Sequence, residues 1–204
     1  MSISPSGSAL QSRFGAAVTR VVESCGDTIA YVNRDRAHEI LAWLRDDPGQ
    51  HFNYLTDVTA VEYRDAERPL EVVYQLRSLD RKADLRVKIE LAKREPLEVD
   101  SVYDLWKGAN WLERETFDMF GVRFRGHPDL RRILMWETYS EGYPLRKDFP
   151  LRGHFSRAEQ TRQALAGNPE AHYSLEELSI AEAFHELPAD MRDRLEKGER
   201  GKVG

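Results

Sequence analysis

The densest group of side chains capable of chemistry lies in residues 111–134, Trp-Leu-Glu-Arg-Glu-Thr-Phe-Asp-Met-Phe-Gly-Val-Arg-Phe-Arg-Gly-His-Pro-Asp-Leu-Arg-Arg-Ile-Leu. Its two neighbouring carboxylates, Glu113 and Glu115, are of the type that general acid–base catalysis uses, one to donate and one to accept a proton. Residues two apart on a helix, however, point about 200° away from each other, so these two side chains cannot face one substrate. The spacing therefore argues against a two-carboxylate active site.

Glu113 is unusual because it falls on the apolar side of the helix that the pattern predicts over residues 110–120. That side consists of Leu112, Thr116, Phe117, Met119 and Phe120. Arg114 and Asp118 fall on the opposite side, where solvent is expected. A buried carboxylate is costly unless it is paired, so we expect Glu113 to meet a cation, either within the fold or across an interface with another protein. The nearby candidates are Arg123, Arg125, Arg131, Arg132, Arg146 and Lys147.

A second block, residues 142–153, reads Gly-Tyr-Pro-Leu-Arg-Lys-Asp-Phe-Pro-Leu-Arg-Gly. Its two prolines, Pro144 and Pro150, favour extended backbone and limit pairing within a sheet. Apolar side chains alternate with charged ones along it. This pattern is typical of a strap that lies over another surface, and equally of a surface loop packed on its own domain.

The elements that must position these blocks can be read from periodicity. Strands are expected at residues 18–23, 28–32, 54–63, 70–79 and 85–91, the first two as a hairpin with Cys25 in its turn and the last three as a meander. Helices are expected at residues 9–14, 37–45 and 110–120, with Asp35 as a cap before the second and Gly121 as the stop of the third. The sequence therefore predicts an α+β fold, with a mixed, largely antiparallel sheet, packed helices and an extended C-terminal segment.

Three segments differ in composition. Residues 1–8 are small and polar, and we expect a flexible N-terminus. Residues 9–153 contain the predicted α+β domain. Residues 154–204 are strongly charged and partly helical in pattern, and we expect a tail that could wrap a partner.

Composition excludes several functions. The chain has 204 residues, 30 Lys and Arg against 35 Asp and Glu, and a formal net charge of −5. This balance argues against a nucleic-acid module built on the arginines of the first block, which would carry a net basic footprint. The single cysteine, Cys25, rules out a disulfide within the chain, a cysteine-rich zinc site and an iron–sulfur cluster held by four thiolates of this chain.

The sequence contains none of the familiar catalytic or phosphate-binding motifs, such as Gly-x-Gly-x-x-Gly, Gly-x-x-x-x-Gly-Lys-[Ser/Thr], His-Glu-x-x-His or Gly-x-Ser-x-Gly. Its first residues lack the basic and apolar regions of a secretory signal. Charges interrupt every apolar stretch short of the ~18 residues that a membrane helix needs. We therefore expect any membrane association to come through a partner.

The two blocks together are recognisable. Glu113-Arg114-Glu115, Asp118-Met119-Phe120-Gly121, His127, Arg131 and Ile133-Leu134 resemble, at matching spacing, the signature of the C-type subunit (the 30 kDa subunit family) of respiratory complex I, the NADH–quinone oxidoreductase. The run from Pro144 to Pro150 is similar to a second hallmark of that family. Weaker agreement upstream extends the resemblance over residues 30–153. Tyr143 stands where a histidine is frequent in the family.

The resemblance implies a non-catalytic structural subunit of the hydrophilic arm, packed against the large D-type subunit that helps to form the quinone site. It implies no cofactor on this chain, with the flavin and the iron–sulfur clusters on other subunits. The complex would couple electron transfer from NADH to quinone to proton translocation. The chain would be peripheral, on the cytoplasmic side of a bacterial membrane.

Carried over position by position, the resemblance makes eight residues candidates for the partner interface: Glu113, Arg114, Asp118, His127, Arg131, Arg146, Lys147 and Asp148. An equivalent subunit of a complex I-like enzyme fed by ferredoxin or a deazaflavin, or of a membrane-bound hydrogenase, is the alternative. The sequence of this one subunit hardly separates the two, because the site of electron input lies elsewhere.

Overall fold

The structure is a computed structural model, which describes residues 4–64, 70–92 and 96–167. Contacts divide the chain into a first unit that runs to His154 and a second that starts at Phe155. The helix α4 (Arg157–Gly167) is the described element of the second unit. Most of the predicted tail, residues 168–204, lies outside the described residues, so its wrapping of a partner stays a prediction.

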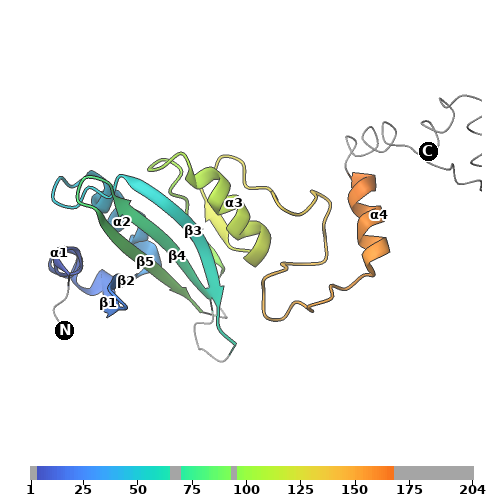
Figure 1. Ribbon diagram of the computed structural model, residues 1–204, viewed down its shortest axis with the longest axis horizontal. Coiled ribbons are helices and arrows are strands. Elements are labelled where there is room, and N and C mark those ends of the chain that lie inside the picture. Colours follow the sequence, from blue (N-terminus) through green and yellow to red (C-terminus); the bar gives the residue numbers. More distant parts are fainter. Residues whose placement is uncertain (1–3, 65–69, 93–95, 168–204) are drawn as a thin grey trace, which may run out of the picture. The chain divides into compact units, whose positions relative to one another are not determined.

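A five-stranded sheet forms the centre of the first unit (Figure 1). Its strands are β1 (Val18–Ser24), β2 (Asp27–Val32), β3 (Tyr54–Glu62), β4 (Leu70–Ser78) and β5 (Ala83–Leu91). They lie in the order β1-β2-β5-β4-β3, with antiparallel pairing everywhere except between β2 and β5, which are parallel. The predicted α+β class with a mixed, largely antiparallel sheet is confirmed, as are the hairpin and the meander.

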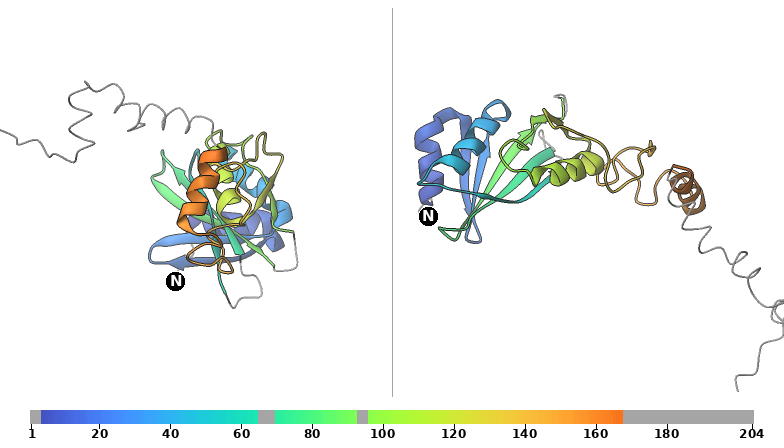
Figure 2. Two further views of the ribbon diagram at one scale, coloured as in Figure 1. Left: turned by 90° about the vertical axis from the view of Figure 1, so that its right-hand side faces the viewer. Right: turned by 90° about the horizontal axis from the view of Figure 1, so that it is seen from above.

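One face of the sheet carries the hydrophobic core. Val87 of β5 pairs with Ala30 of β2 and with Tyr74 of β4, and Tyr74 pairs with Val58 of β3, so the four side chains share a face. All four are buried. The helices α1 (Pro5–Phe14), α2 (Ala37–Asp46) and α3 (Ala109–Phe120) contribute apolar side chains to the same core. These three helices therefore cover the apolar face of the sheet (Figure 2).

The opposite face of the sheet holds charged side chains that pair with one another. Lys88 of β5 contacts Glu71 of β4 at 2.6 Å, with both side chains nearly buried. On the same strand, Glu90 pairs with Arg20 at 2.8 Å, and Arg86 pairs with Asp27 at 3.1 Å. The alternation predicted for residues 85–91 is confirmed, since it places an apolar row inside and a charged row outside.

Local details differ from the sequence predictions. Helix α1 begins at Pro5 rather than Ala9, because the Ser4 hydroxyl accepts a hydrogen bond from the Gly7 N–H and proline suits the first helical turn. Asp35 does not cap α2; it lies within a 3-10 turn, Arg34–Arg36, that leads into the helix. A short parallel pair, β6 (Glu98–Asp100) with β7 (Arg123–Arg125), was not predicted, because three residues show no period.

Candidate interaction site around helix α3

Helix α3 is fixed at the edge of the sheet and ends at a glycine. The Thr116 hydroxyl donates to the carbonyl oxygen of Val58 on the edge strand β3 at 2.9 Å. Gly121 has φ +80°, and its N–H donates to the Phe117 carbonyl, which confirms the predicted stop. A Cβ at Gly121 would lie 2.5 Å from Cε2 of Tyr143, so both the backbone conformation and the close ring require glycine.

Glu113 is fully buried, as the helical pattern predicts, but the predicted pairing with an arginine or lysine is wrong. Its Oε2 accepts from the Ser101 hydroxyl at 2.6 Å, and its Oε1 accepts from the Val102 N–H at 2.7 Å. A neutral hydroxyl and a backbone amide therefore satisfy the carboxyl. Both donors belong to the segment just after β6. Its backbone is irregular, so no periodic pattern in the sequence predicts its position.

His127 is the nearest basic side chain, with Nε2 4.0 Å from Oε2 of Glu113. Its Nδ1 accepts from the Asp129 N–H at 3.0 Å, and its Nε2 lies 3.2 Å from the Asn110 carbonyl oxygen. This arrangement assigns the neutral tautomer with the proton on Nε2, because an imidazolium could not accept at Nδ1. Burial lowers the pKa of His127 in agreement with a neutral ring.

The electrostatics of Glu113 follow from this lack of a cation. Burial raises its pKa to about 7, against the opposing effect of the hydrogen bonds from Ser101 and Val102. Glu115 is exposed, whereas Glu113 is fully buried. The two carboxyls thus lie in different environments, as the helix geometry predicts.

Arg114 is buried, although the helical pattern placed it on the solvent side. Its Nε donates to the carbonyl oxygen of Arg131 at 3.2 Å, and its Nη2 to that of Arg132 at 3.0 Å. The reason for the difference is that residues 129–135 lie against this side of α3. An irregular segment of this kind cannot be placed by periodicity.

Asp118 is fully buried on the same side of the helix. Its Oδ2 accepts from the backbone N–H groups of Ile133, Leu134 and Met135 at 3.0, 2.8 and 2.8 Å. Its Oδ1 lies 2.6 Å from Nη1 of Arg132. Burial raises the pKa of Asp118, but the three amides and the guanidinium outweigh burial and hold it below its ordinary value.

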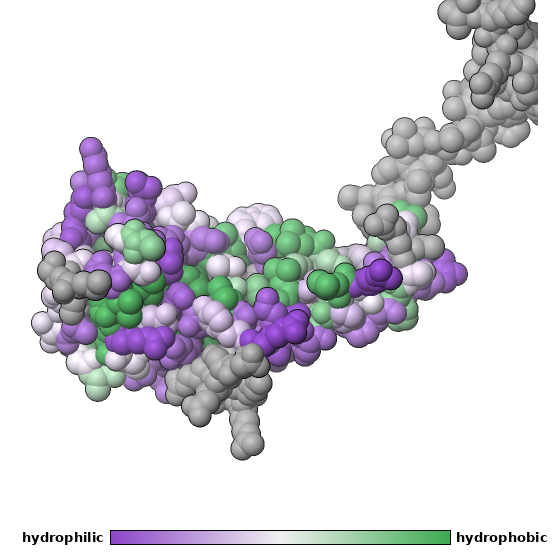
Figure 3. Space-filling view, turned by 60° about the horizontal axis from the view of Figure 1, so that its bottom comes forward, coloured by the Kyte–Doolittle hydropathy of each residue, from purple (hydrophilic) through white to green (hydrophobic). Residues whose placement is uncertain are grey.

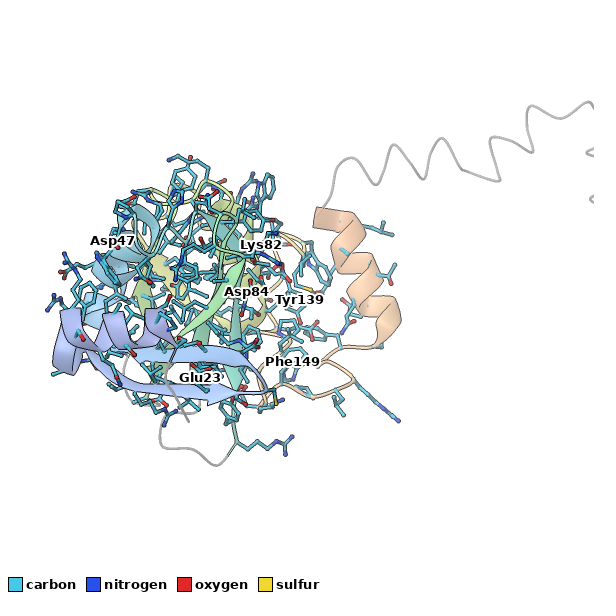
Figure 4. All side chains as sticks on the ribbon, turned by 60° about the vertical axis from the view of Figure 1, so that its left-hand side comes forward. Glu23, Asp47, Lys82, Asp84, Tyr139 and Phe149 are labelled. Carbon is cyan, nitrogen blue, oxygen red and sulfur yellow. The ribbon has the colours of Figure 1, made fainter. Side chains whose placement is uncertain are left out.

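Arg114 and Asp118 thus work as one unit, which we call the clasp: Arg114 holds two carbonyls and Asp118 holds three amides of the segment that covers α3. The guanidinium of Arg132 completes it, since it also donates to the Gly142 carbonyl and lies 5.1 Å from the ring centroid of Tyr139. Tyr139 is labelled in Figure 4. The clasp ties the first block to the start of the second.

The second block packs on its own unit through successive turns rather than as an extended strap. The N–H of Arg146 donates to the Tyr143 carbonyl, and that of Phe149 donates to the Arg146 carbonyl. Arg146 also pairs with Glu62 of β3 at 3.7 Å and with Asp148 at 3.5 Å. Of the two alternatives, the loop of the same domain fits these contacts.

The eight candidate residues divide into two groups. Arg131, Lys147 and Asp148 are exposed, and Arg146 is half-buried. Glu113, Arg114 and Asp118 are buried, as is the His127 side chain, so they shape a surface from within. Sequence reasoning missed Ser101 as the partner of Glu113, and it did not pair Arg132 with Asp118.

The described part of the chain shows no group of three His, Cys, Asp or Glu side chains placed to hold a metal ion. Cys25 is free and exposed in the β1–β2 turn. Within residues 4–64, 70–92 and 96–167, no helix has both the length and the apolar character needed to cross a membrane.

Comparison with known proteins places this arrangement in a family. Residues 30–155 match the family described as respiratory-chain NADH dehydrogenase, 30 kDa subunit. The chain belongs to this family. The match covers nearly the same residues as the resemblance drawn from the two blocks, and it includes α3, the clasp and the second block.

Other members of the 30 kDa subunit family are similar over most of the chain. A C-type subunit of NADH-quinone oxidoreductase from Rhizobium etli is 42% identical over 156 residues, which is 76% of this chain and 82% of that protein. The C-type subunit of NADH-quinone oxidoreductase from Trichlorobacter lovleyi is 45% identical over 146 residues, or 71% of this chain and 87% of that protein.

Two solved structures share the fold. The trypsin-resistant fragment 1–134 of Nqo5 superposes with a TM-score of 0.53 at 28% identity, over 60% of this chain and 97% of the fragment. A chain of an archaeal membrane-bound sulfane sulfur reductase gives a TM-score of 0.59 at 21% identity, over 76% of this chain and 87% of that chain. At that identity the second likeness concerns the fold alone.

Proposed function

We propose that this chain is a non-catalytic scaffold subunit of NADH–quinone oxidoreductase, and that it packs against the large D-type subunit beside the quinone site. In this proposal, NADH oxidation, electron transfer to quinone and the coupled proton translocation take place on other subunits. The chain supports them by holding its neighbours in position. It carries no flavin and no iron–sulfur cluster.

The clasp is the observation that carries this proposal. Arg114 and Asp118, two charged residues of the signature, are buried and bind backbone groups of residues 131–135. Side chains used in this way are not available to a substrate. They fix the shape of a loop, which is what a subunit that docks on a neighbour requires.

The chemistry of the rest of the chain agrees with a scaffold role. A cluster needs several thiolates, and Cys25 is the single cysteine of the sequence. The net charge of −5 does not favour a nucleic-acid partner. We propose a peripheral position on the cytoplasmic side of a bacterial membrane, with the contact to the membrane made by other subunits of the complex.

The alternative, an equivalent subunit of a ferredoxin- or deazaflavin-fed enzyme or of a membrane-bound hydrogenase, has less support. The relatives that are 42% and 45% identical are both named as NADH-quinone oxidoreductase subunits. The archaeal respiratory complex, at 21% identity, supports a shared fold only.

Affinity purification of the tagged full chain from detergent-solubilised membranes, followed by mass spectrometry, tests the proposal. We expect the large D-type subunit and other hydrophilic-arm subunits in the purified material, together with NADH–quinone reductase activity. Recovery of hydrogenase subunits or of a ferredoxin-oxidising complex would favour the alternative. Recovery of the chain without any redox partner would contradict both.

A further inference from the structure

The hydrogen bonds around Glu113 make its two carboxyl oxygens unequal. Oε1 accepts from the Val102 N–H at 2.7 Å, so this oxygen cannot carry a proton along that bond. Oε2 lies 2.6 Å from Oγ of Ser101, and the same Oγ accepts from the Tyr103 N–H at 3.1 Å. A hydroxyl group can donate once and accept twice, so the 2.6 Å bond can carry the proton of either partner. A proton bound by Glu113 is therefore held on Oε2, between the carboxyl and Ser101.

His127 faces the same oxygen with a donor, and we call Glu113 and His127 the buried pair. Nε2 of His127 lies 4.0 Å from Oε2 and 3.2 Å from the Asn110 carbonyl oxygen. Because Nδ1 accepts from the Asp129 N–H, the ring proton is on Nε2. Hydrogen bonds to an ionised acceptor are roughly twice as strong as those to a neutral one. The carbonyl is thus the better acceptor while Oε2 is protonated, and Oε2 is the better one once it is charged.

Titratable and charged side chains from neighbouring elements surround the buried pair. They are His38 of α2, Tyr74 of β4, Asp100 of β6, Asp104 after it, Arg114 of α3, Arg125 of β7 and Asp129. His38 lies 3.0 Å from Asp104, and Arg125 pairs with Asp100 at 2.9 Å. Two of the cationic groups in this set are therefore already matched by a carboxylate.

The remaining three groups supply no free cation to the buried pair. Arg114 binds two carbonyl oxygens in the clasp, and Asp129 pairs with Arg131. The Tyr74 hydroxyl is buried without a hydrogen-bond partner in the described part of the chain, and burial together with the charge of Glu113 raises the pKa of Tyr74, so it stays neutral. A negative charge on Glu113 must therefore be met by hydrogen bonds rather than by an ion pair.

A single side chain separates the Glu113 carboxyl from water. Hydrophilic residues cover much of the surface in the view of Figure 3. Glu113, by contrast, contributes nothing to the surface. Ser101 lies between the two, since its hydroxyl binds the carboxyl and the residue lines a surface pocket with His38 and Asp104. A proton can pass between Glu113 and water through this hydroxyl, so the carboxyl can titrate while the fold stays intact.

We propose that Glu113 and His127 form a proton-controlled hydrogen-bond switch. While Oε2 of Glu113 holds its proton, the Nε2–H of His127 donates to the Asn110 carbonyl, and the observed distances correspond to this state. When the carboxyl releases the proton through Ser101 to water, the Nε2–H turns to Oε2. The ring moves by about 1 Å to reach hydrogen-bond length, and it keeps its single proton throughout.

The switch acts on the segment that covers α3. The N–H of Asp129 donates to Nδ1 of His127, so the backbone at Asp129 follows the ring. Asp129 is the first of the residues 129–135 that lie against α3. Burial raises the pKa of Glu113 to about 7, so the exchange takes place near neutral pH. This inference goes beyond the proposed function and does not depend on it, because every part of the switch belongs to this chain.

NMR spectroscopy of the full chain, labelled with ¹³C and ¹⁵N, reports on each atom of the switch. From about pH 6 to about pH 9, three wild-type signals should shift together, because one proton controls all three. They are the side-chain carboxyl carbon of Glu113, Nε2 of His127 and the carbonyl carbon of Asn110. We expect their shared midpoint at about 7. The two ring nitrogens of His127 should keep the well-separated chemical shifts of a neutral ring across the range.

Two variants separate the switch from general effects of pH. Glu113→Gln imitates the protonated carboxyl and cannot titrate, so the transitions of His127 Nε2 and of the Asn110 carbonyl should disappear. The matched control is Glu115→Gln, which removes an exposed carboxylate two positions later. Its transition midpoint should stay within about 0.2 pH units of the wild-type value, because water and salt screen an exposed charge.

Four results would overturn the switch. The first is the absence of a Glu113 carboxyl transition in this pH range, which the wild type alone decides. The second is a His127 transition that persists in Glu113→Gln. The third is a shift of Nε2 without a shift of the Asn110 carbonyl, which would show that the ring senses the charge but keeps its acceptor. The fourth is protonation of Nδ1. None of these results bears on the proposed function, since none involves a partner.

Discussion

Asp118 and Leu134 are joined by a hydrogen bond of 2.8 Å, from the backbone N–H of a leucine with an exposed side chain to a fully buried carboxylate 16 positions earlier in the chain. The same carboxylate oxygen accepts from the N–H groups on either side, of Ile133 and Met135. One acidic residue thus determines the path of a loop. This explains why a charged residue of the family signature points inward.

Asp118→Asn should destabilise the fold by about 3 kcal/mol, because the partly buried guanidinium of Arg132 loses its anionic partner and three amides lose a charged acceptor. Urea denaturation measures this as a lower transition midpoint with an unchanged slope. The matched control is Asp129→Asn, which removes an exposed pair with Arg131 and should cost less than about 1 kcal/mol. Equal effects of the two substitutions would contradict the clasp.

Glu113 should make the protein less stable as the pH rises. Its pKa in the folded state is about 7, above the ordinary value of 4.5, so the folded state binds the proton more tightly than the unfolded state does. The stability from this group is fully present below pH 4.5 and is lost as the pH rises through about 7. The difference in pKa corresponds to roughly 3 kcal/mol.

Glu113→Gln is the variant that isolates this effect, because it keeps the shape and removes the titration. The free energy of unfolding of wild type and variant is measured from about pH 4.5 to about pH 8. The value for the variant minus the value for the wild type should increase steadily as the pH rises. Subtracting the two curves removes the contribution of all other groups. A constant difference across this range would show that Glu113 does not titrate there.

Glu113→Ala and Glu115→Ala should differ clearly. The first leaves the Ser101 hydroxyl and the Val102 N–H without a partner and opens a cavity, so we expect a loss of about 2–4 kcal/mol in unfolding free energy. The second alters an exposed side chain and should change stability by less than about 0.5 kcal/mol. Thermal melting of the two variants at one pH is sufficient, and similar melting temperatures would argue that Glu113 is not held as described.

Gly121→Ala should destabilise the protein by about 2 kcal/mol or more, because alanine disfavours φ +80° and its Cβ would overlap the Tyr143 ring. Gly108→Ala is the control. No atom lies within 4 Å of the added Cβ there, and φ is −63°, so stability should stay within about 1 kcal/mol of the wild type. A neutral result for Gly121→Ala would mean that Tyr143 moves away freely.

The regular elements could be predicted because their signals are periodic. The alternation of Leu85, Val87 and Ile89 placed β5 with one face in the core, and the helical pattern placed Glu113 inside. Both signals arise within a single strand or helix, because apolar side chains turn toward the core and polar side chains turn toward water.

The residues of the site could be recognised from the sequence, but the directions in which their side chains point could not be predicted. A helical pattern assigns the side without apolar residues to solvent, yet Arg114 and Asp118 are covered by residues 129–135, which have no period of their own. The partners of Glu113 were missed for the same reason, since a backbone N–H such as that of Val102 leaves no mark in a sequence. The turns that replace the extended strap depend on local backbone bonds of the same kind.

The most direct measurement is NADH–quinone reductase activity in membranes from cells that lack this chain, before and after adding the purified wild-type chain. A scaffold subunit predicts activity that is lost without the chain and restored by it, while the purified chain alone shows no NADH oxidation and no flavin or iron–sulfur absorbance. Full activity in the membranes without the chain, or NADH oxidation by the chain alone, would contradict it.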